Sequence, residues 1–244
     1  MYTEYLNNVL KLLDNVAENQ ASLMLETAQV IADAIENNGL VHVVGCGHSQ
    51  MFAQELFHRA GGSVAVNAIL PSALCLAPYA PMSTWAERQC GLAEVALNGE
   101  KDIREGDVLI VVSTSGRNAV PIEFAMEGQK RGLKVIALTS TAFSGATSSR
   151  HPSGKKLAEC ADIVLDNPGE PGDATVQVPN SDFKTGSTSS VMGFAILNSI
   201  MGTANKLLVE RGYEDLILAS VNSTGAVNND EVLAKRQNRL TLFN

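Results

Sequence analysis

The sequence predicts an α/β fold in which helices cover both faces of a parallel sheet. Two observations lead to this class. Short apolar segments bounded by turn residues are typical of buried strands, and they alternate with longer segments that show helical spacing. Strands that alternate with helices form right-handed βαβ units, which produce a parallel sheet with both faces buried.

Two helices are expected before the first strand. Apolar residues recur at helical spacing from Tyr5 to Val16, and again from Leu23 to Ala34. Gly39 ends the second helix, because glycine is common just past a helix C-terminus. Residues 40–44, Leu-Val-His-Val-Val, then form the first short buried strand.

The remaining elements follow the same alternation. Strands are predicted at 63–67, 108–112 and 135–138, with a weaker one at 162–165. Glycine-containing turns precede the first three of these strands. The helices that we expect lie at 50–60, 84–97, 119–131 and 191–209, with a further possible helix at 230–239, and polar loops occupy 142–160 and 166–187.

Composition narrows the classes of function. The 244 residues include 18 Lys and Arg against 26 Asp and Glu, which gives a formal net charge of −8. Binding through nucleic-acid phosphates needs a basic surface, so the acidic balance argues against it. No apolar run approaches the roughly 18 residues of a membrane span, and the N-terminus lacks the pattern of a secretory signal. We therefore expect a cytoplasmic protein that binds neither nucleic acid nor a membrane.

The cysteines give no sign of a metal centre. Cys46, Cys75, Cys90 and Cys160 are far apart and form no CxxC pair. This spacing argues against a zinc ribbon and against a disulfide scaffold. We expect no bound metal.

The first polar loop that follows a strand is Gly45-Cys46-Gly47-His48-Ser49. Gly47, His48 and Ser49 become candidate ligand-binding residues, because glycines allow close approach and a helix start attracts anions. The loop is not a dinucleotide fingerprint, since Gln50 stands where the third glycine would fall. No GxxxxGK[ST] motif occurs, and no cofactor is expected. The alternative is a plain tight turn between strand and helix.

Two further loops gather hydroxyl groups where a helix begins. Ser113, Thr114 and Ser115 follow a strand and precede Gly116 and Asn118, a set of small donors suited to a phosphate. An ordinary helix cap would explain one serine there. The segment 185–190 repeats the pattern before the long apolar helix, with Ser187 and Thr188 as candidates, and capping again explains one of its hydroxyls.

The combination of these motifs resembles the sugar isomerase (SIS) family of phosphosugar-binding domains. The matching features are the Gly45–Ser49 loop, the Ser-Thr-Ser-Gly element at 113–116, and Leu138-Thr139-Ser140 at the end of the next strand. The spacing is closest to that of phosphoheptose isomerases. The resemblance implies a five-stranded parallel sheet in a three-layer α/β/α sandwich of flavodoxin-like winding. One such domain would span 1–210, with 211–244 as its C-terminal extension.

The resemblance also implies a ligand and an assembly. A phosphorylated sugar would be held through its phosphate by Ser113, Thr114, Ser115 and Asn118, although the family usually has Ser or Thr at this last position. Ser140, at the end of the following strand, joins the candidate binding residues. Members form homodimers or homotetramers with sites near subunit contacts, so a homo-oligomer is expected here.

Aldose–ketose isomerisation through an enediol is the expected reaction. It needs a carboxylate base, for which Glu55 is the candidate, and an acid for the sugar oxygens. Phosphoheptose isomerases use a late-helix histidine as the acid, but this chain has no histidine after His151. His151 is therefore the first candidate acid, followed by His48 and then His58.

Three alternatives stay open. Glu55 could form a plain helix-surface ion pair with Arg59, four residues further on. The same fold also supports a non-catalytic phosphosugar-binding module. A third possibility keeps the substrate class and changes the reaction to deamination or ether cleavage of an amino-sugar phosphate.

Overall fold

Five parallel strands form the centre of the protein, seen in a computed structural model that describes residues 2–213, 216–222 and 228–243. The strand order is β2-β1-β3-β4-β5, which confirms the predicted fold class. After β2 the chain crosses over β1 to begin β3, so the winding reverses between β1 and β3. The strands are β1 (Val41–Gly45), β2 (Val66–Ile69), β3 (Val108–Val112), β4 (Lys134–Thr139) and β5 (Ile163–Asp166).

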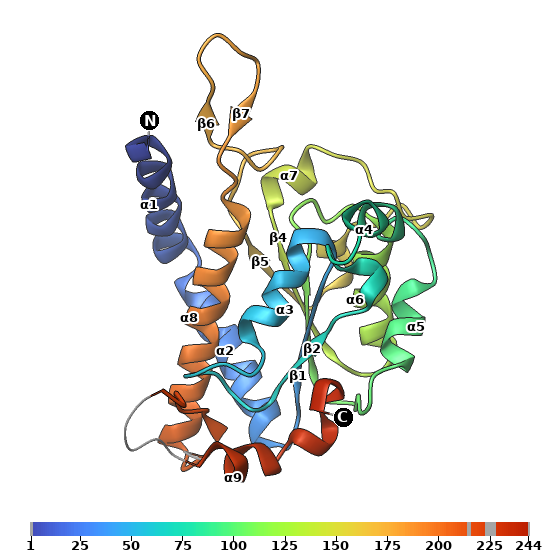
Figure 1. Cartoon of the computed structure of the whole chain (residues 1–244), viewed down its shortest axis with the longest axis vertical. Coiled ribbons are helices and arrows are strands. Elements are labelled where there is room, and N and C mark those ends of the chain that lie inside the picture. The colour runs from blue at the N-terminus through green and yellow to red at the C-terminus, as the bar shows by residue number, and fades with distance from the viewer. Residues whose placement is uncertain (1, 214–215, 223–227, 244) are drawn as a thin grey trace.

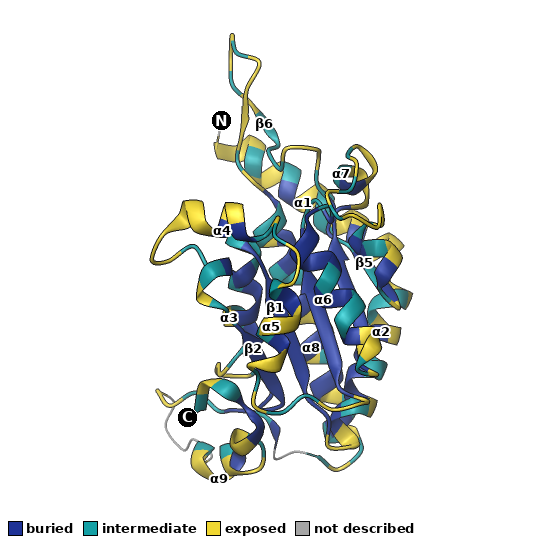
Figure 2. Cartoon of the chain, turned by 90° about the vertical axis from the view of Figure 1, so that its right-hand side faces the viewer, coloured by how far each residue is buried: buried dark blue, intermediate teal, exposed yellow. Residues whose placement is uncertain are grey.

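Both faces of this sheet are buried, as its apolar strands predict. Along β3, Val108, Ile110 and Val112 enter one hydrophobic cluster, while Leu109 and Val111 enter the other. All five side chains are fully buried. Figure 2 shows the strands as a continuous buried layer between helices whose outer surfaces are exposed.

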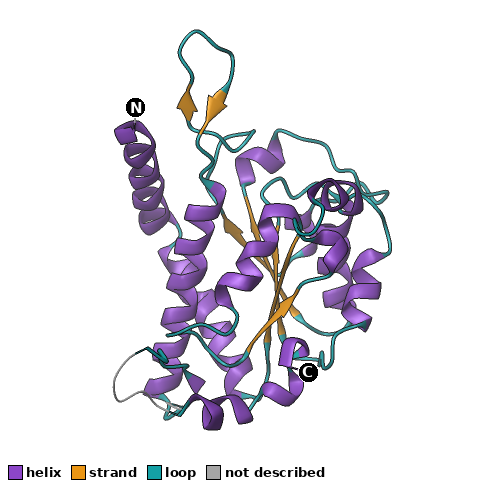
Figure 3. Cartoon of the chain, viewed as in Figure 1, coloured by secondary structure: helices purple, strands orange, loops and turns teal. Residues whose placement is uncertain are grey.

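The two clusters belong to two layers of helices (Figures 1 and 3). The first layer contains α1 (Tyr2–Asn19), α2 (Ala21–Glu36), α3 (Met51–Leu56) and α8 (Ser189–Glu210). The second contains α4 (Ala80–Ala86), α5 (Leu92–Asn98), α6 (Ala119–Lys130) and the short helix η3 (Leu157–Cys160). The sheet therefore divides the molecule into an α8 face and an α6 face.

Short elements complete the chain. At the carboxyl ends of the strands lie η1 (Gly47–Gln50), η2 (Ser72–Leu74), α7 (Thr141–Gly145) and a hairpin formed by β6 (Val176–Gln177) and β7 (Lys184–Thr185). In Figure 1 this hairpin projects from the body beside the start of α1. At the opposite end lie α9 (Asn229–Ala234), η5 (Gln237–Arg239) and η6 (Thr241–Phe243).

Helix α8 is long and apolar enough to cross a membrane by length and composition alone. No such segment was expected, because no unbroken apolar run in the sequence approaches the length of a membrane span. Half of the apolar window is buried inside the fold, where the helix packs along α2 and also contacts α1 and α3. Its composition is that of a helix with much of its surface in a core.

Several predicted elements have different bounds in the structure. The possible helix at 230–239 is α9 followed by η5, and the loop predicted at 142–160 contains most of α7 and all of η3. Strand β2 begins three residues later than expected. The predicted helix 84–97 is broken into α4 and α5, because Gly91 adopts a φ of +90°. The predicted helix 50–60 ends as α3 at Leu56, since the chain becomes extended at Phe57 and His58 takes a φ of +45°.

Candidate functional site

A pocket lies at the carboxyl end of the sheet, where the loops after β1 and β3 face the start of α8. Its volume is about 300 Å³. Four residues predicted from three separate loops, His48, Ser49, Thr114 and Ser187, line it together. Ligands of open parallel sheets bind at this point of reversed winding. The full lining is His48, Ser49, Phe52, Thr114, Gly172, Asp173, Ser187, Ser189 and Ser190.

The loop after β1 presents His48 and Ser49 to this pocket. Gly45 has no room for a side chain, because a Cβ there would lie 2.3 Å from the Ser49 carbonyl oxygen. Gly47 then opens η1 at a φ of +58°. His48 is exposed, and its imidazole makes no hydrogen bond to the described part of the chain.

The loop after β3 is held by Ser113 and leaves the next two hydroxyls free. The Ser113 hydroxyl accepts the Gly116 amide at 3.2 Å. Gly116 has a φ of +58°, and a Cβ there would lie 2.8 Å from Thr139 Oγ1. Thr114 and Ser115 are half-buried, and their hydroxyls have no partner among the described residues. Free hydroxyls beside the start of α6 are suited to bind an anion.

Asp173, which the sequence analysis missed, organises the start of α8. Its Oδ1 accepts the Thr188 amide at 3.2 Å and the Ser189 amide at 2.9 Å. Its Oδ2 accepts the Ser189 hydroxyl at 2.5 Å. The buried Thr188 is the N-cap residue, and its own side chain makes no cap hydrogen bond. The carboxylate therefore fixes the helix end that lines the pocket.

Two predicted phosphate ligands have side chains that are already engaged. The Ser140 hydroxyl donates to the Gly169 carbonyl at 2.9 Å and caps α7 by accepting the Phe143 amide. Asn118 Oδ1 accepts from Arg150 Nη1 at 2.9 Å, and its side chain also hydrogen-bonds Glu87. Their roles as phosphate ligands stay predictions.

Positive charge gathers where α6 begins. Burial lowers the pKa of the Arg150 guanidinium, and the charges of Arg117 and Arg88 lower it further. Burial also raises the pKa of Glu87, an effect that Asn118 and the arginines oppose. The cluster could not be predicted from the sequence, because its three arginines come from segments with no common motif.

Glu55 lies one helical turn beyond the pocket. It is on α3, three residues after Phe52, and does not line the pocket. Its carboxylate pairs with Arg59 and accepts from Asn198 Nδ2 of α8 at 3.0 Å. The ion pair that sequence reasoning held open as the alternative is thus present.

His151 lies on the other side of the sheet. Its Nε2 is 3.7 Å from Glu123 Oε1 of α6, whereas Glu55 belongs to a helix of the α8 face. One chain therefore does not bring Glu55 and His151 together. The third candidate acid, His58, packs edge-on against Phe243 and does not line the pocket either.

Comparison with known proteins gives a consistent family assignment. A family model described as SIS domain matches residues 4–140. A UPF0309 protein of Listeria innocua is 39% identical over 238 residues, which covers 98% of this chain and 96% of the relative. A UPF0309 protein of Halalkalibacterium halodurans is 40% identical over 232 residues, which covers 95% and 96%.

Solved structures show the same fold. A phosphoheptose isomerase from Francisella tularensis superposes with a TM-score of 0.56 at 18% identity, covering 84% of this chain and 96% of that chain. The phosphoheptose isomerase from Neisseria gonorrhoeae gives a TM-score of 0.54 at 18% identity, covering 84% and 97%. At such identity the likeness concerns the fold alone.

Proposed function

We propose, because this chain belongs to the SIS domain family, that it binds a phosphorylated sugar in the pocket between the β1 and β3 loops and α8. The observation that supports this most is the meeting of hydroxyl-bearing residues from three separate loops. Ser49, Thr114 and Ser190 line one pocket although they lie far apart in the sequence. Hydroxyls both donate and accept, which suits the phosphate and the hydroxyls of a sugar phosphate.

We further propose that the protein interconverts an aldose phosphate and its ketose, with His48 transferring the proton. Among the residues that the structure describes, two titratable side chains line the pocket, His48 and Asp173. The oxygens of Asp173 are occupied by two amides and a hydroxyl, so this carboxylate serves the helix start. His48 has both ring nitrogens available. Its imidazole can take the proton from one carbon and return it to the adjacent carbon, while a pocket hydroxyl such as that of Thr114, or solvent, passes a proton between the two sugar oxygens.

A second candidate function is phosphosugar binding without turnover. This function is supported by the scarcity of free proton-transfer groups among the described residues that line the pocket. Glu55 reaches a substrate only after leaving Arg59 and Asn198. A binding module needs the hydroxyls and no base.

The binding proposal is tested with Thr114→Val, which removes a hydroxyl and keeps the shape. Calorimetry with a panel of aldose and ketose phosphates should show affinity about 10–100-fold weaker than that of the wild type, the loss expected for a hydrogen bond to a charged group. Thr203→Val on α8 is the matched control, because its hydroxyl bonds the Ser199 carbonyl within the helix. Equal affinity of Thr114→Val and wild type would remove this pocket from consideration.

The catalytic proposal is tested with His48→Gln. Turnover of the sugar phosphate that binds should fall by about 10²–10⁴-fold, with affinity within a few-fold of the wild type. Glu55→Gln should leave turnover within a few-fold, because its carboxylate lies outside the pocket. A large loss in Glu55→Gln would transfer the role to that residue. A wild type that binds a sugar phosphate tightly and does not turn it over would contradict the catalytic proposal and favour the non-catalytic binding module.

A further inference from the structure

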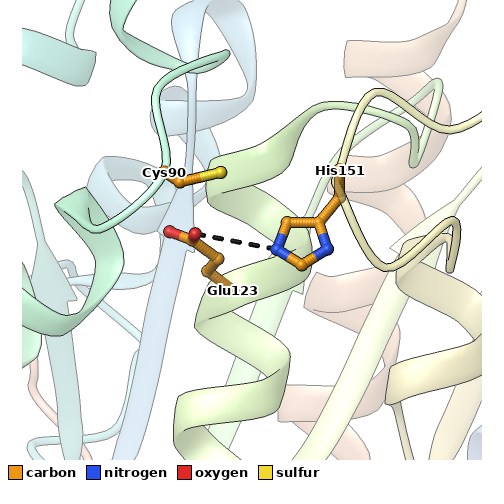
Figure 4. A group of neighbouring side chains, drawn as sticks. All are labelled: Cys90, Glu123 and His151. Carbon is orange, nitrogen blue, oxygen red and sulfur yellow. Dashed lines mark ion pairs between the residues drawn. The ribbon is translucent and has the colours of Figure 1, made fainter.

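Three side chains with metal-ligating atoms meet on the α6 face (Figure 4). None of them lines the pocket of the proposed function. Cys90 lies in the turn between α4 and α5, Glu123 on α6, and His151 in the loop between α7 and η3. One ligand atom from each lies within 4.8 Å of the other two. We propose that these residues bind a divalent transition metal ion, and that Zn²⁺ fits the donor set best.

The distance between His151 and Glu123 supports a shared metal ion. His151 Nε2 and Glu123 Oε1 are 3.7 Å apart, which is too long for a hydrogen bond. Zinc bonds of about 2.0–2.3 Å at tetrahedral angles separate neighbouring ligand atoms by roughly 3.3–3.6 Å. The two atoms thus stand close to the separation of ligands that share one ion.

Neighbouring groups already orient two of the three ligands. His151 Nδ1 accepts the Ser153 backbone amide at 3.2 Å and lies 2.7 Å from the Ser153 hydroxyl. Coordination of a metal by Nε2 would place the ring proton on Nδ1, where the hydroxyl can accept it in place of the bond from the amide. Glu123 Oε2 accepts the Gly91 amide at 2.7 Å and leaves Oε1 available. Because Gly91 follows Cys90 directly, the same carboxylate also holds the thiol-bearing turn in place.

Arg88 and Arg150 are close to Cys90 and His151 in the sequence, but the pocket beside the cluster carries an excess of carboxylates, which favours a cation there. A neighbouring pocket of about 220 Å³ is lined by Glu94, Glu123 and Glu127, with Lys130 as its cation. Lys130 forms an ion pair with Glu127, so the lining keeps an excess of negative charge. The pocket also leaves room for water or a small ligand as a fourth donor. A thiol, an imidazole and a carboxylate together select zinc over magnesium or calcium.

A reactive cysteine is the competing interpretation of this cluster. Partial desolvation and then the Glu123 carboxylate raise the pKa of the Cys90 thiol. A nucleophilic cysteine needs the opposite, a positive environment that stabilises the thiolate. A divalent cation reverses this balance, because it binds the thiolate while the thiol proton leaves to solvent.

A metal bound here would fasten the loop that holds the start of α6. His151 follows Arg150, whose backbone amide donates to the Arg117 carbonyl at 2.8 Å and whose guanidinium binds Asn118. The ion would tie this loop to α6 and to the α4–α5 turn. The metal site would therefore stabilise this part of the fold. Its role does not depend on the proposed sugar chemistry.

The test is direct metal binding by the full chain, without a polyhistidine tag, after chelator treatment and in the absence of sugars. Zn²⁺ is titrated by calorimetry, and Co²⁺ serves as the spectroscopic probe. The ligand variants are Cys90→Ser, Glu123→Gln and His151→Gln. The matched controls are Glu94→Gln, which lines the same pocket, and Cys75→Ser, a half-buried thiol outside the cluster.

We expect one Zn²⁺ per wild-type chain, and affinity at least tenfold weaker in each ligand variant. The thiolate-to-Co²⁺ charge-transfer band should disappear in Cys90→Ser and persist in both controls. Saturating Zn²⁺ should also protect Cys90 from alkylation. Thermal unfolding of the metal-free proteins checks that the variants fold.

Three results would overturn the site. They are a wild type that binds no Zn²⁺ at micromolar concentration, ligand variants that bind as tightly as the wild type, and alkylation of Cys90 that is equally fast with and without Zn²⁺. None of them bears on sugar-phosphate affinity, so the pocket of the proposed function is judged separately.

Discussion

Asp107 is a buried acidic residue that directly precedes β3. Its side chain is 1% exposed. Its carboxylate accepts the Leu40 and Arg104 amides at 2.8 and 2.9 Å, and Arg239 Nη2 lies 3.0 Å from Oδ2. His42 Nε2 is also 3.0 Å from Oδ2. A buried carboxylate persists as an anion only with such donors around it.

The hydrogen bond with Asn67 determines which ring nitrogen of His42 carries the proton. The Asn67 side-chain amide lies 3.1 Å from His42 Nδ1 and can only donate to it through Nδ2. Nδ1 is therefore the acceptor, and Nε2 carries the proton that it donates to Asp107. Burial alone would raise the pKa of Asp107, but the hydrogen bonds from His42, Leu40 and Arg104 outweigh burial and lower it.

Replacing Asp107 with Asn should lower the free energy of unfolding by about 3 kcal/mol, near the low end of the cost of a broken buried ion pair. The low end applies because Arg239 keeps its contact with Asp102 at 2.9 Å. Urea denaturation at pH 7 measures this loss. The exposed Asp182→Asn is the control and should change stability by under about 0.5 kcal/mol.

The pH dependence of the free energy of unfolding provides an independent test of the role of Asp107. A depressed carboxyl pKa stabilises the fold fully above the unfolded-state value of about 3.9, and this stability is lost as the pH falls through the folded-state pKa. The wild type should therefore lose stability steeply below about pH 4, and Asp107→Asn should show a flatter curve there. Parallel curves for the two proteins would contradict this assignment.

Single residues of the candidate site differ in how visible they are in the sequence. Ser49 and Thr114 were predictable, because they directly follow apolar strands whose carboxyl ends share one edge of the sheet. Asp173 was not, since it meets Thr188 and Ser189 across 15 and 16 residues of polar loop. The local signal, Pro171-Gly172, indicates only a turn. The Cys90–Glu123–His151 cluster likewise has no short spacing that would reveal it.

At the scale of elements, the close packing of α3 against α8 shapes the candidate pocket between the β1 and β3 loops and α8. Gly193 in α8 permits this approach, because a Cβ there would lie 2.4 Å from the Phe52 ring. Phe52 in turn packs on Phe194 at 4.7 Å between ring centroids and lines the pocket. The distance between the two helices is thus set by one missing side chain.

Gly193→Ala should destabilise the protein by about 1–3 kcal/mol, because overpacking displaces the Phe52 ring. It should also weaken sugar-phosphate binding. Gly202→Ala in the same helix is the matched control, since a Cβ at Gly202 meets nothing within 4 Å. The control should gain up to about 1 kcal/mol from better helix propensity. Equal changes in thermal unfolding of the two variants would show that the α3–α8 contact is not tight.

The bounds of a strand could be predicted accurately where nearby residues in the sequence determine them. Strands β1, β3, β4 and β5 lie within one residue of their predicted bounds, because their apolar runs end at glycines and polar loops. The β2 segment differs. Residues 63 and 64 are buried as predicted, but they pair with the chain near Leu216 and Ile217 in place of the sheet. No local pattern could show a partner about 150 residues away in the sequence.

At the scale of the molecule, the C-terminal segment closes the amino end of the sheet. Arg239 is 4% exposed, and it reaches Asp107, Asp102 and the Asn38 carbonyl, the last at 2.5 Å. Thr241 donates to Glu100 at 2.6 Å. Residues predicted as an extension therefore supply buried partners to residues much earlier in the chain, at the end of the sheet opposite the candidate pocket.

The outer surface of α1 is a candidate interface for the predicted homo-oligomer. Its inner side packs through Val9 and Val16, yet Tyr2, Leu6 and Leu10 are 82%, 56% and 58% exposed at spacings of four. Full burial of one such leucine is worth about 1.5–3 kcal/mol. We expect a homo-oligomer that buries this outer side of α1, as the family resemblance implies.

Sedimentation at micromolar concentration should then show a wild type heavier than the 25.9 kDa monomer. The double variant Leu6→Asp with Leu10→Asp should shift the protein to the monomer, because each carboxylate would have to be buried unpaired in the interface. Val95→Asp provides the comparison, since Val95 is 68% exposed on α5 in the other layer of helices. That variant should sediment as the wild type does. A wild type found only as a monomer would contradict the assembly itself, whereas dissociation of Val95→Asp alone would move the interface to the α6 face.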